Sequence, residues 1–242
     1  MRYYILSDIH GNLDALDAVL QSIGKEAAGA YLCLGDVVGY GADPVACLKR
    51  VRSISPRVMI AGNHEWGVLG SLRPEYFNEY ALEAVEWTRD ELTAEEIGYL
   101  RSFKIEYRRP EFELVHGTLD EPGEFKYILG QEDTRGTFDA MRSGLCFVGH
   151  SHTAGIFVSE GDGVLQALSS RVSLEPGKKY IVNAGSVGQP RDRDPRAAYA
   201  VYDEEDGSVR ISRVEYNVKS ARKKILDAGL PAYLGDRLLD GR

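Results

Sequence analysis

The sequence predicts an α/β (α+β) fold in which a two-sheet β-sandwich is flanked by helices. The first third of the chain alternates short apolar runs with loops and amphipathic segments, which is typical of a layered unit with a partly parallel sheet. The second half is mostly a series of short apolar runs, which indicates strands. With 242 residues the chain can bury one sizeable core, so we expect a single domain over residues 1–242.

Three strands are predicted near the start of the chain, and each ends at a polar or glycine-rich loop: Tyr3–Ser7, Tyr31–Leu34 and Val58–Ile60. Between the first two, apolar side chains from Leu13 to Ile23 recur at helical spacing and predict a helix. A second helix is expected from about Asp43, because the following proline suits the first position of a helix.

Residues 66–110 depart from this alternation, since they are rich in glutamate and aromatic side chains. We predict two helices here, Pro74–Leu92 and Ala94–Phe103, and interpret the segment as a helical insertion on the rim of the domain. Its aromatic side chains, Trp66 and Phe77 among them, either form core or line a substrate pocket.

Seven short apolar runs beyond this segment predict strands: Phe112–His116, Leu145–Gly149, Ile156–Ser159, Val164–Leu168, Tyr180–Val182, Ala197–Tyr202 and Val209–Val214. A final helix is expected over Val218–Ala228. The apolar tail after it, with Leu234 and Leu238, either docks on the same domain or on a second subunit, so a homo-oligomer stays open.

The composition argues against several classes of protein. A net charge of −8 disfavours an extended nucleic-acid surface, which needs clustered lysine and arginine. A small phosphorylated partner still fits, because bound divalent ions can reverse the charge of a pocket. No stretch approaches the ~18 apolar residues of a membrane span, and the first residues lack a signal-peptide core. The three cysteines show no CxxC spacing, so we predict a cytoplasmic protein without a disulfide framework or membrane contact.

Five strand ends carry potential metal-binding side chains. The motifs are Asp8-Ile9-His10, Gly35-Asp36, Gly62-Asn63-His64-Glu65, His116-Gly117 and Gly149-His150-Ser151-His152. Loops at the ends of parallel strands meet at one edge of a sheet, and residues i and i+2 of an extended backbone point to the same side. Where the local backbone is extended, Asp8 with His10, and His150 with His152, can therefore each direct two donors toward a common point.

This mixture of carboxylate, imidazole and amide oxygen suits Mn, Fe, Co, Ni or Zn. Each motif alone occurs by chance in loops, but all five histidines of the sequence lie at strand ends of this kind. An aspartate that gives one oxygen to each of two ions would complete a dinuclear centre. Such a centre can activate water as hydroxide and stabilise charge on a phosphoryl group.

The order of these motifs resembles that of the calcineurin-like metallophosphoesterase superfamily, and the GDVVGYG stretch resembles its compact prokaryotic phosphodiesterase-like members. The resemblance covers Met1 to about Arg191 and implies the four-layer metallophosphoesterase fold. It implies two metals bridged by Asp36, with these further ligands: Asp8, His10 and His152 for the first metal, and Asn63, His116 and His150 for the second. Manganese is the expected metal, with Fe, Zn, Ni or Co as alternatives.

The resemblance also implies that His64 is catalytic rather than a ligand. It would contact the phosphoryl group, either stabilising the transition state or protonating the leaving oxygen. The implied reaction is hydrolysis of a phosphodiester or phosphoanhydride of a small molecule or nucleotide through metal-bound hydroxide.

Phosphoprotein phosphatases of the superfamily carry an arginine after the GD motif, where Val37–Gly41 stand here. A broad phosphomonoesterase or Ser/Thr protein phosphatase is therefore the alternative, and a non-catalytic scaffold of the same fold is a third option. Asn12 and Arg191 are candidate substrate-binding residues. Asn12 fits a helix N-cap equally well, and Arg191 fits a surface ion pair. Tyr40 either stacks on a nucleobase or packs beneath its loop.

Overall fold

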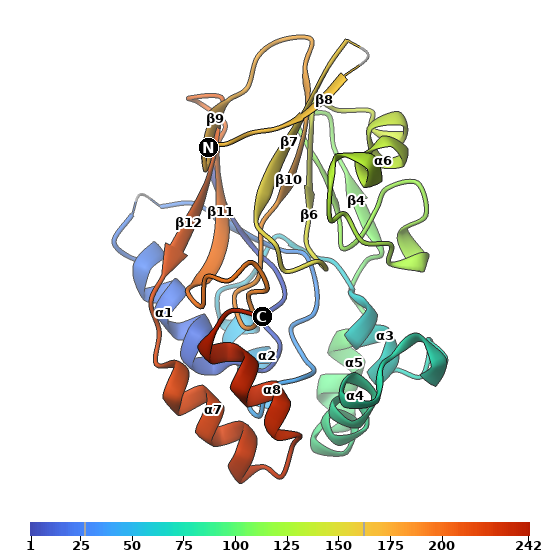
Figure 1. Ribbon diagram of the computed structural model, residues 1–242, viewed down its shortest axis with the longest axis vertical. Helices are drawn as coiled ribbons and strands as arrows, with labels where there is room; N and C mark the ends of the chain where they lie inside the picture. The colour runs from blue at the N-terminus through green and yellow to red at the C-terminus, as the bar shows by residue number, and fades with distance from the viewer. Residues whose placement is uncertain (27, 162) are drawn as a thin grey trace.

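The computed structural model describes residues 1–26, 28–161 and 163–242, and its centre is a pair of six-stranded mixed sheets (Figure 1). The first sheet has the order β3 (Val58–Met59), β2 (Ala30–Cys33), β1 (Arg2–Leu6), β11 (Ala197–Asp203), β12 (Ser208–Val214) and β9 (Arg171–Ser173). The second has the order β4 (Glu106–Arg108), β5 (Glu113–Val115), β6 (Leu145–Val148), β10 (Lys179–Asn183), β7 (Gly155–Glu160) and β8 (Gly163–Gln166).

Both faces of the first sheet are buried, and β1 shows how. Because side chains of a strand alternate in direction, Tyr3 and Ile5 pack into the core between the sheets, where the Tyr3 ring lies 5.1 Å from that of Phe112. Tyr4 and Leu6 belong to the opposite core, which helices cover. The sandwich with helices on its outer faces confirms the predicted fold class.

The helices that cover the first sheet begin where the sequence places them. The helix α1 (Leu13–Ile23) starts at Asn12, whose side chain accepts a hydrogen bond from the Ala15 amide at 3.1 Å. The helix α2 (Pro44–Ser53) has Pro44 at its first position, as predicted. The second sheet is covered by the short helix α6 (Arg135–Ala140), which the sequence analysis did not predict.

The segment 66–110 differs in detail from its prediction. A single helix over Pro74–Leu92 is wrong at its start: a 3-10 turn, η1 (Pro74–Tyr76), is followed by a break, and α4 (Glu79–Glu91) begins only after Asn78 caps it. The next helix, α5 (Ala94–Leu100), is shorter than predicted. The segment also contains strand β4, and its interpretation as an insertion stays a prediction.

The C-terminal tail docks on the same domain. After α7 (Val218–Asp227), the short helix α8 (Ala232–Asp236) and the turn η4 (Arg237–Leu239) fold back. Leu234 and Leu238 are buried with Ile225 of α7 and Ala84 of α4, so the tail lies at the same end of the molecule as the 66–110 helices (Figure 1). Within the described part of the chain, no helix has the length and apolar character to cross a membrane.

Candidate metal centre

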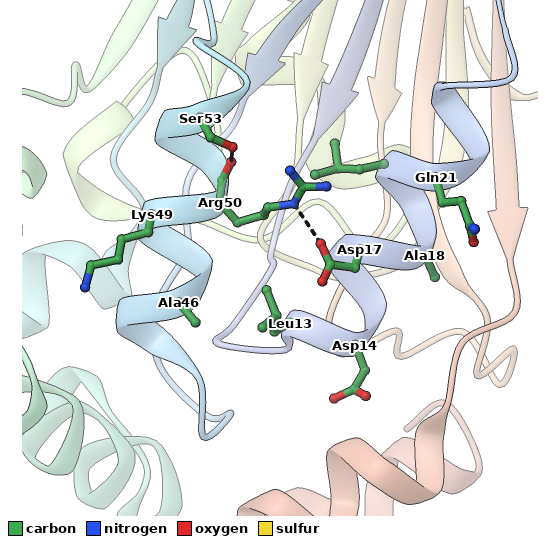
Figure 2. Close-up of a pocket in the computed structure, with 10 residues that line it drawn as sticks. Leu13, Asp14, Asp17, Ala18, Gln21, Ala46, Lys49, Arg50 and Ser53 are labelled. Carbon is green, nitrogen blue, oxygen red and sulfur yellow. Dashed lines mark hydrogen bonds and ion pairs between the residues drawn. The ribbon is translucent and has the colours of Figure 1, made fainter.

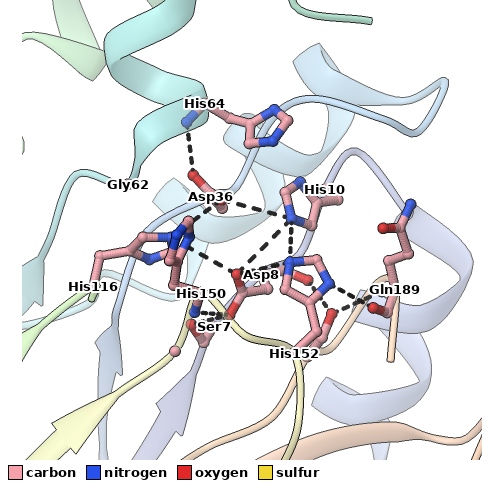
Figure 3. Close-up of polar contacts among 12 residues, drawn as sticks. Ser7, Asp8, His10, Asp36, Gly62, His64, His116, His150, His152 and Gln189 are labelled. Carbon is pink, nitrogen blue, oxygen red and sulfur yellow. Dashed lines mark hydrogen bonds and ion pairs between the residues drawn. The ribbon is translucent and has the colours of Figure 1, made fainter. Parts of the chain in front are cut away.

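The strand-end motifs of both sheets come together in one buried cluster (Figure 3). Asp8 and His10 follow β1, and Asp36 follows β2. Four further predicted residues join them after β3, β5 and β6: His64, His116, His150 and His152. These seven side chains are each 5% exposed or less. The predicted ligand Asn63 is half-buried beside them, so all eight predicted metal-site and catalytic residues belong to one region.

The backbone at this cluster is left-handed rather than extended. Five of the residues have φ angles between 47° and 65°: Asp8, His10, Asp36, His150 and His152. Non-glycine residues adopt this region rarely, and do so most often where function fixes the backbone. The expected i, i+2 convergence therefore has a different origin for Asp8 and His10. For His150 and His152 the extended backbone that the expectation required is not observed, and the two residues belong to two different groups of donors.

The donors form two groups that share one residue. Asp8, His10, Asp36 and His152 each offer an atom within 4.8 Å of the others, and so do Asp36, His116 and His150. In the first group, His10 Nε2 lies 3.0 Å from His152 Nε2 and 3.6 Å from Asp36 Oδ2. In the second group, His116 Nε2 lies 3.2 Å from the same Asp36 oxygen. Asp36 therefore stands between two adjacent donor groups.

Backbone carbonyls orient three of the imidazole rings. The Nδ1 atoms of His10, His116 and His152 contact the carbonyl oxygens of Val38, Leu34 and Gln189 at 3.0, 2.7 and 2.6 Å. A carbonyl only accepts, so each Nδ1 carries a proton and donates it. Burial lowers the pKa of His10 and of His152, so these two rings are neutral and their Nε2 atoms present lone pairs to the cluster. Metal-binding histidines are commonly oriented by such a bond from their second nitrogen.

The chemistry of this donor set fits divalent cations. Two lone pairs at 3.0 Å, as between the Nε2 atoms of His10 and His152, repel each other unless a cation lies between them. Asp8 Oδ1 and Asn63 Oδ1 are buried without a hydrogen-bond partner among the described residues, which is costly unless a ligand satisfies them. Two carboxylates and four imidazoles match the preferences of first-row transition metals.

The charges of the cluster also favour the binding of cations. Burial raises the pKa of Asp36, but His116 and His64 lower it by more, to well below its ordinary value. Burial lowers the pKa of His116, yet Asp36 raises it by more, to about 10. The carboxylates therefore stay ionised and stabilise positive charge at the centre of the cluster. Burial lowers the pKa values of His64 and His150 to about 4 and about 3, so these two rings are neutral there.

Glu65 is a site residue that the sequence analysis missed. Its carboxylate is fully buried and accepts hydrogen bonds from the backbone amides of Asp36, Val37 and Gly62 at 2.7–2.8 Å. It thereby ties the loop after β2 to the start of α3 (Asn63–Val68), where it occupies the third helical position. The spacing Gly-Asn-His-Glu is that of a helix N-terminus with an acidic residue at N3, and this signal could have identified it.

A family model described as the calcineurin-like phosphoesterase superfamily domain matches residues 1–207. The chain belongs to this superfamily. Its members are metal-dependent phosphoric ester hydrolases, which agrees with the buried His/Asp cluster at the strand ends. The family predicted from the motif order is therefore confirmed.

Individual relatives of this phosphoesterase cover its whole length. The protein MJ0912 of Methanocaldococcus jannaschii is 38% identical over 243 residues, covering 98% of this chain and 97% of its own. The crystal structure of a metallophosphoesterase from Sphaerobacter thermophilus is 36% identical, superimposes with a TM-score of 0.87 and covers all of both chains. The structure of PH1004 from Pyrococcus horikoshii OT3, 21% identical with a TM-score of 0.78, shares the fold across 100% of this chain and 98% of its own.

The two candidate substrate-binding residues of the phosphoesterase, Asn12 and Arg191, lie in different surroundings. Asn12 is buried and has a structural role, since its side chain caps α1 and donates to the Gly188 carbonyl at 2.8 Å. Arg191 follows the loop of β10, has no carboxylate within ion-pair distance in the described residues, and lies over the Tyr40 ring at 5.5 Å. The Tyr40 ring in turn packs 4.4 Å from the His64 ring, so Tyr40 belongs to the wall of the site.

A separate hollow lies between α1 and α2 (Figure 2). It is lined by surface side chains, including Asp14, Lys49 and the exposed Asp17–Arg50 ion pair, whose atoms are 2.7 Å apart. None of the predicted site residues lines it, so we assign it no part in the chemistry.

Gly39 determines where the His64 ring can lie, and Gly39→Ala should therefore impair activity more than metal binding. Gly39 has a φ of +86°, and an added Cβ would lie 2.1 Å from His64 Nδ1. We expect a loss of about 1–3 kcal/mol in unfolding free energy from backbone strain, together with a displaced His64 and a phosphoesterase rate reduced on the order of tenfold or more. Urea unfolding, metal analysis and diester turnover measure the three quantities.

Gly70→Ala is the matched control, because Gly70 has a φ of +72° with no atom within 4 Å of the added Cβ. It should lose stability but keep activity. Equal activity loss in both variants would contradict the role given to Gly39.

Proposed function

We propose that the protein hydrolyses a phosphodiester or phosphoanhydride of a small molecule or nucleotide at a dinuclear metal centre, with manganese as the working metal. The observation that carries the proposal is the position of Asp36, whose carboxylate is common to two adjacent groups of donors. A shared carboxylate is the feature that two cooperating ions require. The cytoplasmic location predicted from the sequence is part of this proposal.

One ion would be held by Asp8, His10, Asp36 and His152, and the other by Asp36, His116, His150 and Asn63. When bound, the ions supply a nucleophile from water at neutral pH and offset the negative charge of the phosphoryl oxygens. The chain itself keeps the donors fixed. Backbone carbonyls hold three rings in one orientation. The Ser7 hydroxyl and the His150 amide donate to Asp8 Oδ2 at 2.5 and 3.1 Å, which leaves Asp8 Oδ1 directed at the cluster.

His64 lies beside the donors without belonging to either group. Its amide donates to Asp36 Oδ1 at 2.9 Å, and its ring packs 4.7 Å from that of His10. Its Nδ1 has no hydrogen-bond partner in the described part of the chain. A buried imidazole with a free nitrogen next to the donors is suited to bind a phosphoryl oxygen, which supports the catalytic role implied by the motif.

Two observations bear on the substrate. The stretch Val37–Gly41 lies at the site, where the Val38 carbonyl accepts from His10, and it carries no cationic side chain. This disfavours the phosphoprotein phosphatase alternative. A symmetrical bis(5'-nucleosyl)-tetraphosphatase of Yersinia pestis is 39% identical over 71 residues, which are 28% of this chain and 25% of that protein. That local similarity supports a phosphoanhydride substrate.

The test is metal content followed by hydrolysis. The purified chain loaded with Mn should contain about two ions per molecule and release p-nitrophenol from bis-p-nitrophenyl phosphate faster than from p-nitrophenyl phosphate. A chain that binds two ions but is inert toward diesters, monoesters and dinucleoside polyphosphates would support the scaffold alternative instead.

His64→Ala should lower the turnover of the diester by about 10²–10⁴-fold and leave the metal content nearly unchanged, because the lost ring contacts the phosphoryl group and no metal. Steady-state kinetics and elemental analysis of the same preparation measure both quantities. Loss of one metal ion in this variant would show that His64 is a ligand, and the assignment would be wrong.

A further inference from the structure

A pocket of about 580 Å³ adjoins the metal centre and has no role in the chemistry described so far. Two of its lining residues touch the donor histidines: the Tyr40 ring lies 4.6 Å from that of His10, and the Tyr127 ring stacks on His150 at 4.0 Å. The far side is formed by the start of α4 and by the C-terminal segment. A substrate whose phosphorus is at the metal centre would therefore extend into this pocket.

The pocket contains two arginines that have no acidic side chain as a partner among the described residues. Arg191 and Arg237 both line it, and neither forms an ion pair with an aspartate or glutamate side chain in the described part of the chain. Arg191 donates to the Gln189 side chain at 2.8 Å, and Arg237 donates to a main-chain oxygen of Arg242. Glu79 also lines the pocket, but within the residues that the structure describes it forms an ion pair with neither arginine, so both guanidinium groups are available to an anion.

The two charges also affect each other. Burial lowers the pKa of Arg237, and the positive charge of Arg191 lowers it further. Two like charges that face one pocket repel each other, and an anion between them would remove that cost. Guanidinium groups bind phosphate oxygens through paired N–H donors, which makes a phosphoryl group the best-matched anion.

Aromatic rings border the arginines. Tyr80 and Tyr233 stack on each other at 4.9 Å, and Arg237 lies over the Tyr233 ring at 5.3 Å. The two tyrosines are 37% and 49% exposed, which is high for large side chains at the edge of a pocket. Exposed aromatic faces beside a phosphate-binding group suit a nucleobase.

We propose that this pocket binds the leaving part of the substrate, with a second phosphoryl group between Arg191 and Arg237 and a nucleobase against Tyr80 and Tyr233. The substrate is accordingly a nucleotide with a phosphoanhydride, and this inference rests on the proposed function. In the reaction, water oxygen forms a bond to the scissile phosphorus while the anhydride P–O bond breaks. The water proton passes to solvent, and the departing phosphate takes the electron pair of the broken bond and is stabilised by the two arginines.

The test compares two substrates of the Mn-loaded chain. Diadenosine tetraphosphate has further phosphates that can extend to Arg237. The single phosphate of bis-p-nitrophenyl phosphate would lie at the metal centre, which leaves no phosphate for Arg237. Arg237→Gln should lower kcat/KM for the tetraphosphate at least about tenfold more than for the diester, and Arg237→Lys, which keeps the charge but not the paired donors, should lie between. Lys223→Gln removes a similar charge from the exposed side of α7 and should leave both activities unchanged.

A binding measurement gives a readout independent of turnover. In equilibrium dialysis, the wild-type chain should bind α,β-methylene adenosine diphosphate about tenfold more tightly than adenosine monophosphate, and Arg237→Gln should abolish this preference. An equal loss of both activities, or an unchanged preference in the variant, would overturn the inference. Wild-type hydrolysis of the diester without hydrolysis of the tetraphosphate would overturn it too while the proposed function survives. Inactivity toward both substrates would defeat the proposed function itself.

Discussion

Asp36→Asn should reduce the metal content from about two ions to one or fewer per chain and lower diester turnover on the order of 10²–10³-fold. The amide can keep one contact, because its oxygen can still accept from the His64 amide. Its NH₂ group then faces the Nε2 atoms of His10 and His116, at the place of the carboxylate oxygen that lies 3.6 and 3.2 Å from them. A donor in that place cannot bind a cation, and the charge that favours cations is lost.

Metal analysis by mass spectrometry and kinetics with Mn provide the measurement. Asp17→Asn is the control, since Asp17 is an exposed aspartate of α1 that pairs with Arg50 far from the donors. The control should retain two ions and full turnover. Retention of two ions by Asp36→Asn would mean that no carboxylate is shared, and the dinuclear interpretation would have to be abandoned.

Glu65→Gln should cost about 2–4 kcal/mol in unfolding free energy, although it changes only one atom. The carboxylate uses both oxygens, one for the Val37 amide and one shared by the amides of Asp36 and Gly62. A glutamine has one acceptor, so at least one buried amide would face an NH₂ group. The loops that carry Asp36 and Asn63 would then separate, and metal content should fall as well.

Urea unfolding of the metal-free and Mn-loaded chains separates the two effects of this change. We expect the loss in the metal-free chain from the unpaired amides and an additional loss in the loaded chain from weaker metal binding. Glu95→Gln is the control, because Glu95 is exposed and forms a surface ion pair with Arg52. If Glu65→Gln unfolds at the urea concentration of the wild type, the three amide contacts do not stabilise the site.

The sequence predicted the elements whose signal is local. Strand β1 and helix α1 follow from apolar spacing and a polar cap, and both are observed at the predicted place. The break before α4 was missed because Asn78 is a cap inside an otherwise helical composition. The hydrogen bond that its Oδ1 accepts from the Ala81 amide sets the start of the helix. Strand β9 was missed because three residues give no readable alternation, and its pairing with β12 alone defines it.

The members of the donor cluster could also be predicted from a local signal. Their geometry could not be predicted. Histidine is rare in this sequence, so its restriction to strand ends is visible without a structure. The left-handed backbone at Asp8 and His150 depends on contacts between loops of different strands, which no local pattern encodes. The place of Arg237 in the pocket could not be predicted from the sequence either, because Arg237 reaches the pocket through the folding of the tail back over α4.

The order of strands in the first sheet has a consequence for how the protein is made. Strand β1 lies between β2 and β11, and its residue Ile5 pairs with Ala200. At about 5–20 residues per second, a ribosome needs roughly 10–40 s to synthesise the chain between these two strands. Throughout that time the edge of β1 that pairs with β11 has no partner strand, and an unpaired strand edge promotes aggregation. All five histidines are therefore synthesised before β11 completes the first sheet, and metal uptake should be among the last events of folding.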